Sequence, residues 1–227
     1  MDLKDLKLCA EKLYESTIDR TKSYPNSADK LFIGNKDYWH LNACISQFNG
    51  ESAYISGYLD AAKLLSRIVI FSGRHVDTLV YPIIFLYRHY LELTLKELIR
   101  EGLNITNTPI DSKLEKILEE HNLMTLWNCF VPFFTKISGH NNDFKKVKKG
   151  MESYINQIHQ IDPISIAFRY QRSRNGQKCN LEEIKHINIG LFCQNMEKLT
   201  GLLEDISCEF GVALDYTNDV RTEYHDF

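Results

Sequence analysis

The chain has 227 residues, of which 44% are hydrophobic and 25% are charged, and its formal net charge is −3. This composition is typical of a globular protein that buries a core without disulfides or metals, and the length suits one large domain. The slightly acidic balance argues against a uniformly basic nucleic-acid-binding protein but is compatible with a local basic patch.

Reduced thiols and the absence of a long apolar segment indicate a soluble cytoplasmic protein. No cysteine belongs to a Cys-x-x-Cys pair, and several lie within apolar helical patterns, so we expect thiols in the core. The N-terminal stretch "MDLKDLKLCAEKLYE" lacks the apolar core of a signal peptide. Arg67 and Arg88 interrupt the longest apolar runs, so we expect no membrane span.

The N-terminal half of the chain has mainly helical periodicity. Residues 3–18 predict a short amphipathic helix, and residues 19–36 are rich in Pro, Asn, Ser and Gly and predict a loop. Residues 51–71 predict a helix that ends at Ser72-Gly73. The next predicted helix spans 77–100 and stops at Gly102.

Helical patterns continue through the middle of the chain. The segment "DSKLEKILEEH" predicts a helix that begins with Ser112 and Glu115 at capping-box spacing. Residues 122–137 form a bulky apolar helical segment, and residues 142–160 predict a helix that is basic at its start.

The C-terminal part contains one irregular segment and one long helix. After Pro163, residues 164–170 alternate in polarity and predict a short extended piece, followed by a polar loop. Residues 180–211 predict a helix that Asn180 caps and Gly211 ends. The remaining residues, 212–227, predict a loosely held acidic tail.

These elements predict a single all-α domain, a bundle of long antiparallel helices with short irregular appendages. Residues 1–50 are its N-terminal helix and loop appendage, residues 51–211 its bundle core, and residues 212–227 its tail.

The predicted helix over residues 77–100 carries one line of charged side chains in an otherwise apolar surface. His89, Glu92 and Lys96 follow one another at spacings of three and four, and Arg88 lies four residues before Glu92. A solvent-exposed stripe of weak ion pairs is one interpretation. The other is a buried ion network around Glu92, for which Arg169 is the first-choice cation and Arg88 or Lys96 the second.

Two short motifs resemble those of prokaryotic HEPN-like helical proteins, over roughly residues 75–210. The segment "YRHYLELTLK" is similar to the family's Tyr/Phe-Arg-His-x-x-Glu-x-x-Leu-Lys helix, and "DPISIAFRY" to its Asp/His-Pro-x-x-x-x-Phe-Arg-Tyr loop. The resemblance implies a helical bundle, commonly dimeric, from toxin–antitoxin or anti-phage systems. Many members of the family are metal-independent ribonucleases.

The ribonuclease motif of that family, an Arg followed after about four to six residues by a His, is absent from this sequence. Ribonuclease activity is therefore not implied by the resemblance. A non-standard catalytic site remains an alternative, in which Arg88, His89 and Arg169 converge to handle the 2′-hydroxyl proton and the phosphate charge.

Two basic segments are candidate nucleic-acid contacts. The segment "FKKVKKG" places four lysines at the start of a helix, and "FRYQRSRNGQK" combines basic residues with an aromatic residue, which suits phosphate contact and base stacking. A solvated charged face is the alternative interpretation. The candidate residues are Lys145, Lys146, Lys148, Lys149, Tyr170, Arg172, Arg174 and Lys178.

No metal or cofactor is expected. His40 with Cys44, and His186 with Cys193, lack further ligands at suitable spacing. The sequence contains no Walker A, Gly-x-Gly-x-x-Gly or Gly-x-Ser-x-Gly motif.

The sequence therefore predicts a HEPN-like module of a prokaryotic defence or toxin–antitoxin system, which binds RNA or a protein partner from the same operon with little or no catalysis. The alternatives are a metal-independent ribonuclease and a structural homodimer whose interface lies on helices 51–71 and 77–100.

Overall fold

The computed structural model describes residues 27–28, 30–34, 36, 39–45, 51–139, 143–171, 181 and 184–225. The chain divides into two compact units, Met1–Gln47 and Phe48–Phe227. In the first unit, the described residues include one 3₁₀ helix, η1 (Trp39–Leu41). The helix predicted for residues 3–18 lies outside the described residues.

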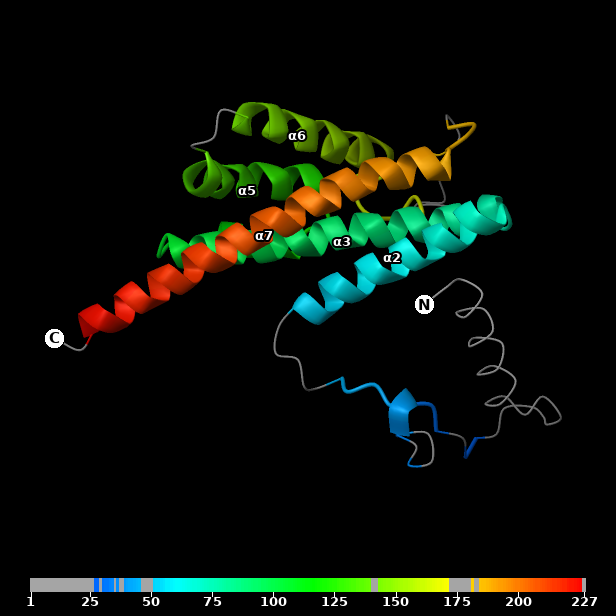
Figure 1. The fold of residues 1–227 in the computed structure, drawn as a ribbon, viewed down its shortest axis with the longest axis horizontal. Coiled ribbons are helices and arrows are strands. Elements are labelled where there is room, and N and C mark those ends of the chain that lie inside the picture. Colours follow the sequence, from blue (N-terminus) through cyan, green and yellow to red (C-terminus); the bar gives the residue numbers. More distant parts are fainter. Residues whose placement is uncertain are drawn as a thin grey trace. The chain divides into compact units, whose positions relative to one another are not determined.

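The second unit is an all-α bundle, as the sequence predicts, and its described residues contain no strand (Figure 1). Its helices are α2 (Ser52–Ser72), α3 (Val76–Ile105), α4 (Ser112–Glu119), α5 (Leu123–Ser138), α6 (Phe144–Ile161) and α7 (Ile189–His225). Helix α3 packs against α2, α5 and α7, and α5 also packs against α6. Figure 1 shows that α2 and α3 run antiparallel, as do α5 and α6.

The central place of α3 explains why its sequence is apolar nearly all round. Its buried side chains include Tyr87, Leu91, Leu95 and Ile99, which join one core with residues of α5 and α7. A helix with neighbours on several sides has no wide face left for charged residues. The line of charged side chains on α3 must therefore lie in the interior or in a narrow gap between neighbours.

Two glycines that we expected to end helices lie inside them instead. Helix α3 continues through Gly102 to Ile105, and α7 continues through Gly211 to His225. The segment predicted to be a loose tail is thus helical as far as the structure describes it. Arg221 contributes to this by donating hydrogen bonds to the backbone and side-chain oxygens of Asn104, at 2.6 and 2.9 Å.

Helix starts also differ from the expected positions. Helix α4 is capped by Asp111, whose side chain accepts a hydrogen bond from the Leu114 N–H at 2.7 Å, and not by Ser112. Helix α7 begins at Ile189, where Asn188 accepts from the Leu191 N–H at 3.0 Å. Short polar side chains cap helices by this bond, and the nearest suitable residue decides the boundary.

The extended piece predicted for residues 164–170 is wrong. The N–H groups of Arg169 and Tyr170 both donate to Ile166 O at 3.0 Å, so the backbone forms turns. Ser165 adopts a left-handed conformation with φ 60°. Alternating polarity in so short a segment does not separate a strand from a series of turns.

Glu101 on α3 is a half-buried carboxylate whose Oε2 has no hydrogen-bond partner among the described residues. Burial, and to a lesser extent the charge of Glu97, raises its pKa from 4.5 to about 7. The folded protein therefore holds a proton that the unfolded chain releases between these pKa values, and stability falls as the pH rises through this range. We expect Glu101→Gln to raise the melting temperature at about pH 8 and to change it little at about pH 5.

The control is Glu119→Gln, which replaces an exposed carboxylate on α4. Thermal unfolding of both variants at the two pH values checks the expectation. An equal gain for Glu101→Gln at both pH values would contradict it, because the gain would then not depend on ionisation.

Candidate functional site

Arg88 on α3 lies in the interior of the bundle with 0% of its surface exposed. Its Nε donates to Asp162 O at 3.1 Å, and its Nη2 donates to His121 O at 2.5 Å. Its Nη1 donates to Glu92 Oε2 at 3.1 Å. Arg88 therefore joins α3 to the segment before α5 and to the segment after α6.

Glu92, which is 1% exposed, is the second centre of this arrangement. Its Oε1 accepts a hydrogen bond from Lys96 Nζ at 2.9 Å and lies 2.8 Å from His121 Nδ1. Burial raises the pKa of Glu92, but the hydrogen bonds from His121 and Lys96 outweigh it, so the pKa lies below its usual value. Glu92 is an ionised carboxylate inside the protein, as expected.

Asp162, also 1% exposed, connects the interior to the surface turn that follows it. Its Oδ2 lies 3.4 Å from Arg88 Nε. Its Oδ1 accepts from the N–H groups of Ile166 at 2.7 Å and Ala167 at 3.0 Å. One carboxylate thus both balances the charge of Arg88 and fixes the turn over residues 163–170.

We call Arg88, Glu92, Lys96, His121 and Asp162 the buried ion network. Two permanent cations face two carboxylates, so its charges balance. Such a network fixes the arrangement of the elements that it joins, because any member left alone would be a charge without water. Only His121, with 55% of its side chain exposed, reaches solvent substantially.

This geometry does not suit a catalytic role for Arg88. A fully buried guanidinium whose nitrogens all donate within the protein cannot also contact the phosphate of an RNA bound at the surface. The convergence of Arg88, His89 and Arg169 in one cleft, which the ribonuclease alternative requires, is therefore not what the structure shows.

Arg169 does not pair with Glu92, contrary to our expectation. The turn fixed by Asp162 leaves Arg169 exposed, and its Nε donates to Ser165 O at 2.5 Å. Its guanidinium carbon lies 5.4 Å from the centre of the Phe85 ring and 5.5 Å from that of Tyr170. Both are cation–π contacts, and the one with Phe85 joins the turn to the surface of α3.

His89 contacts the same Phe85 ring. The two rings are stacked, with centres 5.7 Å apart and 10° between their planes, and Tyr58 of α2 meets His89 edge-on at 4.4 Å. Burial lowers the pKa of His89, so the imidazole is neutral at neutral pH. We call Tyr58, Phe85, His89, Arg169 and Tyr170 the aromatic–arginine cluster.

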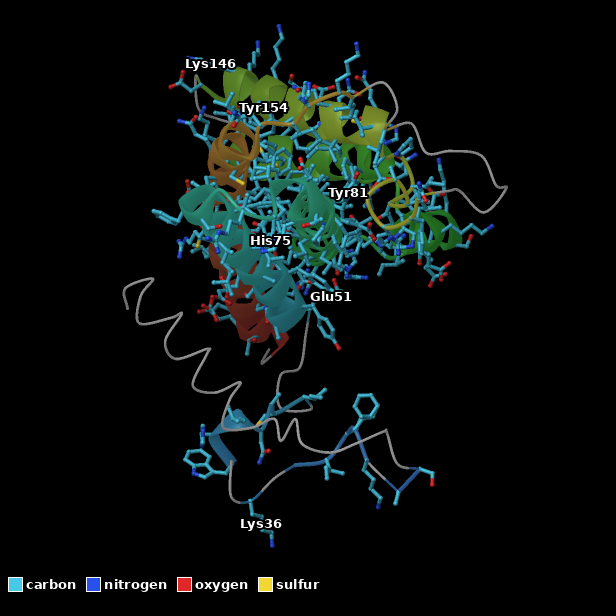
Figure 2. The ribbon with its side chains drawn as sticks, turned by 90° about the vertical axis from the view of Figure 1, so that its right-hand side faces the viewer. Lys36, Glu51, His75, Tyr81, Lys146 and Tyr154 are labelled. Atoms are coloured by element: carbon cyan, nitrogen blue, oxygen red, sulfur yellow. The ribbon has the colours of Figure 1, made fainter. Side chains whose placement is uncertain are left out.

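The lysines of α6 lie away from this cluster. Lys145, Lys146, Lys148 and Lys149 occupy its first turns, and Figure 2 shows Lys146 on the outer side of the bundle. Arg169 follows the other end of α6, which is roughly 27 Å long for its 18 residues. The two basic segments therefore do not form one compact site, and Arg172, Arg174 and Lys178 lie outside the described residues.

Sequence reasoning missed His121 as a member of the network and Phe85 as the centre of the cluster. Phe85 precedes His89 by one helical turn, so their contact could have been inferred from spacing. His121 carried no comparable signal, because it lies 29 residues from Glu92 and in an irregular segment.

Within the described ranges, no group of His, Cys, Asp and Glu side chains is arranged to hold a metal ion, and no helix is long and apolar enough to cross a membrane. Comparison with family models, curated proteins and solved structures gives no significant match to the chain.

Proposed function

We propose that this chain is a HEPN-like helical module of a prokaryotic defence or toxin–antitoxin system that binds single-stranded RNA without cleaving it. The resemblance rests on two motifs far apart in the sequence, and these meet in space, where Arg88 of the first bonds to Asp162 of the second. A shared structural role for both motifs supports the family assignment.

The observation that carries the RNA-binding proposal is the aromatic–arginine cluster. Arg169 and Tyr170 are both exposed, and the guanidinium lies against two rings. Proteins bind single strands by stacking bases on aromatic and guanidinium planes while nearby cations contact the phosphates. The cluster supplies both kinds of contact on neighbouring residues.

The same geometry supports a role without catalysis. Metal-independent cleavage needs a group that accepts the 2′-hydroxyl proton and cations that stabilise the phosphate. A neutral His89 meets the first need, but Arg88 is buried in the ion network. Of Arg88 and Arg169, the two cations of the ribonuclease alternative, Arg169 is the one that lies at the surface.

Removal of the stacking groups is expected to weaken RNA binding. A base stacked on an aromatic side chain contributes about 1–3 kcal/mol, so we expect Tyr170→Ala to raise the dissociation constant about tenfold. Arg169→Met is expected to weaken binding and to reduce its dependence on salt, because one phosphate contact is lost. Fluorescence anisotropy with a labelled single-stranded RNA measures both effects.

Matched controls lie on other elements. Tyr216→Ala replaces a tyrosine of α7 that is 71% exposed, and Arg74→Met replaces an exposed arginine between α2 and α3. Both should bind RNA as the unaltered protein does. Equal binding by all four variants would rule out the cluster as the RNA site.

Catalysis is tested separately by incubation of the protein with total RNA in the presence of EDTA. No cleavage is expected. Robust cleavage that His89→Ala abolishes would instead establish the ribonuclease alternative.

A further inference from the structure

A groove lies between α6 and α7, both of which pack against α5. Tyr154, in the last third of α6, donates a hydrogen bond to Asn195 Oδ1, near the start of α7, at 3.3 Å. Asp143, which caps the start of α6, lines the same hollow as Glu209, which lies farther along α7. The two helices therefore run antiparallel, and we call the space between them the α6–α7 groove.

Aliphatic side chains form the floor of the α6–α7 groove. Met151 and Leu199 are each 1% exposed there, and Val147 and Leu202 are half-buried. Gly150 lines the α6 wall without a side chain, and an added Cβ would meet nothing within 4 Å. This part of the groove has a volume of about 420 Å³, which is within the range of small-molecule sites. An apolar body of that size would leave water on binding here.

Two hydrogen-bond donors from opposite helices meet at one end of the α6–α7 groove. The Tyr154 hydroxyl and the Lys198 ammonium both line it, and both donate to Asn195 Oδ1, at 3.3 and 3.2 Å. The fold thus already holds one acceptor oxygen between a phenol and a cation at the end of the aliphatic floor. A ligand carboxylate beside Asn195 would accept from the same two donors, and its charge would strengthen both bonds.

Charges along the α6–α7 groove give its ligand a direction. Lys146 of α6 (Figure 2) and Lys198 of α7 line the part with the aliphatic floor, beside one carboxylate, Asp143. The far part is lined instead by Asp205 and Glu209 together with Asp143. A negative head group is therefore attracted to the end with Lys198 and repelled from the far end.

These features select a small amphipathic anion over a nucleic acid. The floor between the two lysines is aliphatic, so it offers no aromatic or guanidinium plane on which a base could stack. A polyanion would also bring phosphates against Asp205 and Glu209. A straight-chain carboxylate has one charge at one end and an apolar chain behind it, and this matches both parts of the groove.

We propose that the α6–α7 groove binds a free fatty-acid anion. Its carboxylate bonds to Tyr154 and Lys198, and its chain lies over Met151 toward the acidic end. The observations that select this ligand are the converging donors, the aliphatic floor and the separation of charges along the groove. The inference does not depend on RNA binding, since the groove and the aromatic–arginine cluster have no residue in common.

Isothermal titration calorimetry of the full chain with decanoate is the first test. We expect a dissociation constant on the order of 10–100 μM. Because every methylene group that leaves water adds to binding, octanoate should bind about tenfold more weakly and dodecanoate about tenfold more tightly. Decanol, which has the same chain without the charge, should bind about tenfold more weakly than decanoate. No binding of decanoate, or equal binding of decanoate and decanol, would overturn the proposal.

Gly150→Leu locates the bound chain, because the added side chain would occupy the groove. Leucine favours helix more than glycine does, so the fold should gain stability while the dissociation constant for decanoate rises about tenfold or more. Gly57→Leu is the matched control, since Gly57 lies inside α2 with nothing within 4 Å of an added Cβ and does not line the groove. Unchanged binding by Gly150→Leu, or equal weakening by both variants, would show that decanoate does not occupy this groove.

The head-group contacts are tested by Lys198→Met and Tyr154→Phe. Each should raise the dissociation constant for decanoate about tenfold and leave that for decanol unchanged, because only the carboxylate uses the lost donor. Lys113→Met on α4 and Tyr216→Phe on α7 replace exposed residues away from the groove and should change neither value. An equal loss for decanoate and decanol would show that the substitutions damage the floor, and the assigned position of the carboxylate would be wrong.

Co-sedimentation with phosphatidylglycerol vesicles separates a free fatty acid from a membrane lipid as the source of the chain. We expect no co-sedimentation, because the Tyr154–Asn195 bond joins the two helices at the end where a lipid would have to continue into its glycerol and second chain. Vesicle binding that Gly150→Leu abolishes would identify a membrane lipid as the occupant and would overturn the proposal.

Discussion

Replacement of Arg88 by methionine is expected to lower the free energy of unfolding by about 3–5 kcal/mol. Methionine fills a similar volume but donates no hydrogen bond. Asp162 and the carbonyl oxygens of Asp162 and His121 would then lose the donor that they share in the interior. Urea denaturation of Arg88→Met beside the unaltered protein measures the loss.

A double-mutant cycle separates this loss from a simple packing defect. Asp162→Asn removes the charge that Arg88 balances, so the variant with both substitutions should lose less stability than the sum of the single losses. Arg169→Met is the control, because an exposed cation–π contact contributes about 0.5–1 kcal/mol. A loss for Arg88→Met no larger than that of Arg169→Met would contradict the buried network.

The buried ion network also explains how the interior positions the surface cluster. The Asp162 carboxylate forms an ion pair with Arg88 through Oδ2, which lies 3.4 Å from Arg88 Nε, and accepts hydrogen bonds from the N–H groups of Ile166 and Ala167 through Oδ1. The turn that presents Arg169 and Tyr170 is therefore held by the charge of Arg88. In the proposed RNA-binding role of the cluster, Arg88 would act by positioning this turn and not by contact with RNA.

Local pattern was sufficient to predict the helices and to make the interior one of two interpretations for the place of Glu92. Helical periodicity extends over each of α2, α3, α5 and α6, but an apolar helix with one charged line fits both an exposed stripe and a polar gap in the core. Local pattern did not predict which residues from other elements bond to the charged side chains of α3. Arg88 bonds to residues 33 and 74 positions away, and no local signal indicates which loop returns to it.

Arg169 shows why the choice of partner was wrong. Its sequence position after Pro163 made it a reasonable cation for Glu92, but Arg88 and Lys96 already stand one helical turn on either side of that carboxylate. Local pairs on one helix form without any loop having to close. Arg169, which is distant in sequence from Glu92, therefore lies at the surface.

Gly102→Ala is the second substitution with a large expected effect. Alanine normally stabilises a helix relative to glycine, by about 1 kcal/mol. Here an added Cβ would lie 2.5 Å from Phe133 Cγ and 2.8 Å from Phe133 Cβ, so α5 or the Phe133 ring must move. Gly102 is thus present for the close approach of α3 and α5, and not to end α3 as its sequence position suggested.

The cost of overpacking should exceed the gain in helix propensity, and we expect Gly102→Ala to lose about 1–3 kcal/mol in urea denaturation. Gly150→Ala is the control, because its Cβ meets nothing within 4 Å and the variant should gain about 0.5–1 kcal/mol. A smaller side chain opposite the substitution, as in Gly102→Ala with Phe133→Leu, should cost less than the two single losses combined. Stabilisation by both alanines alike would mean that α3 and α5 are not in close contact at Gly102.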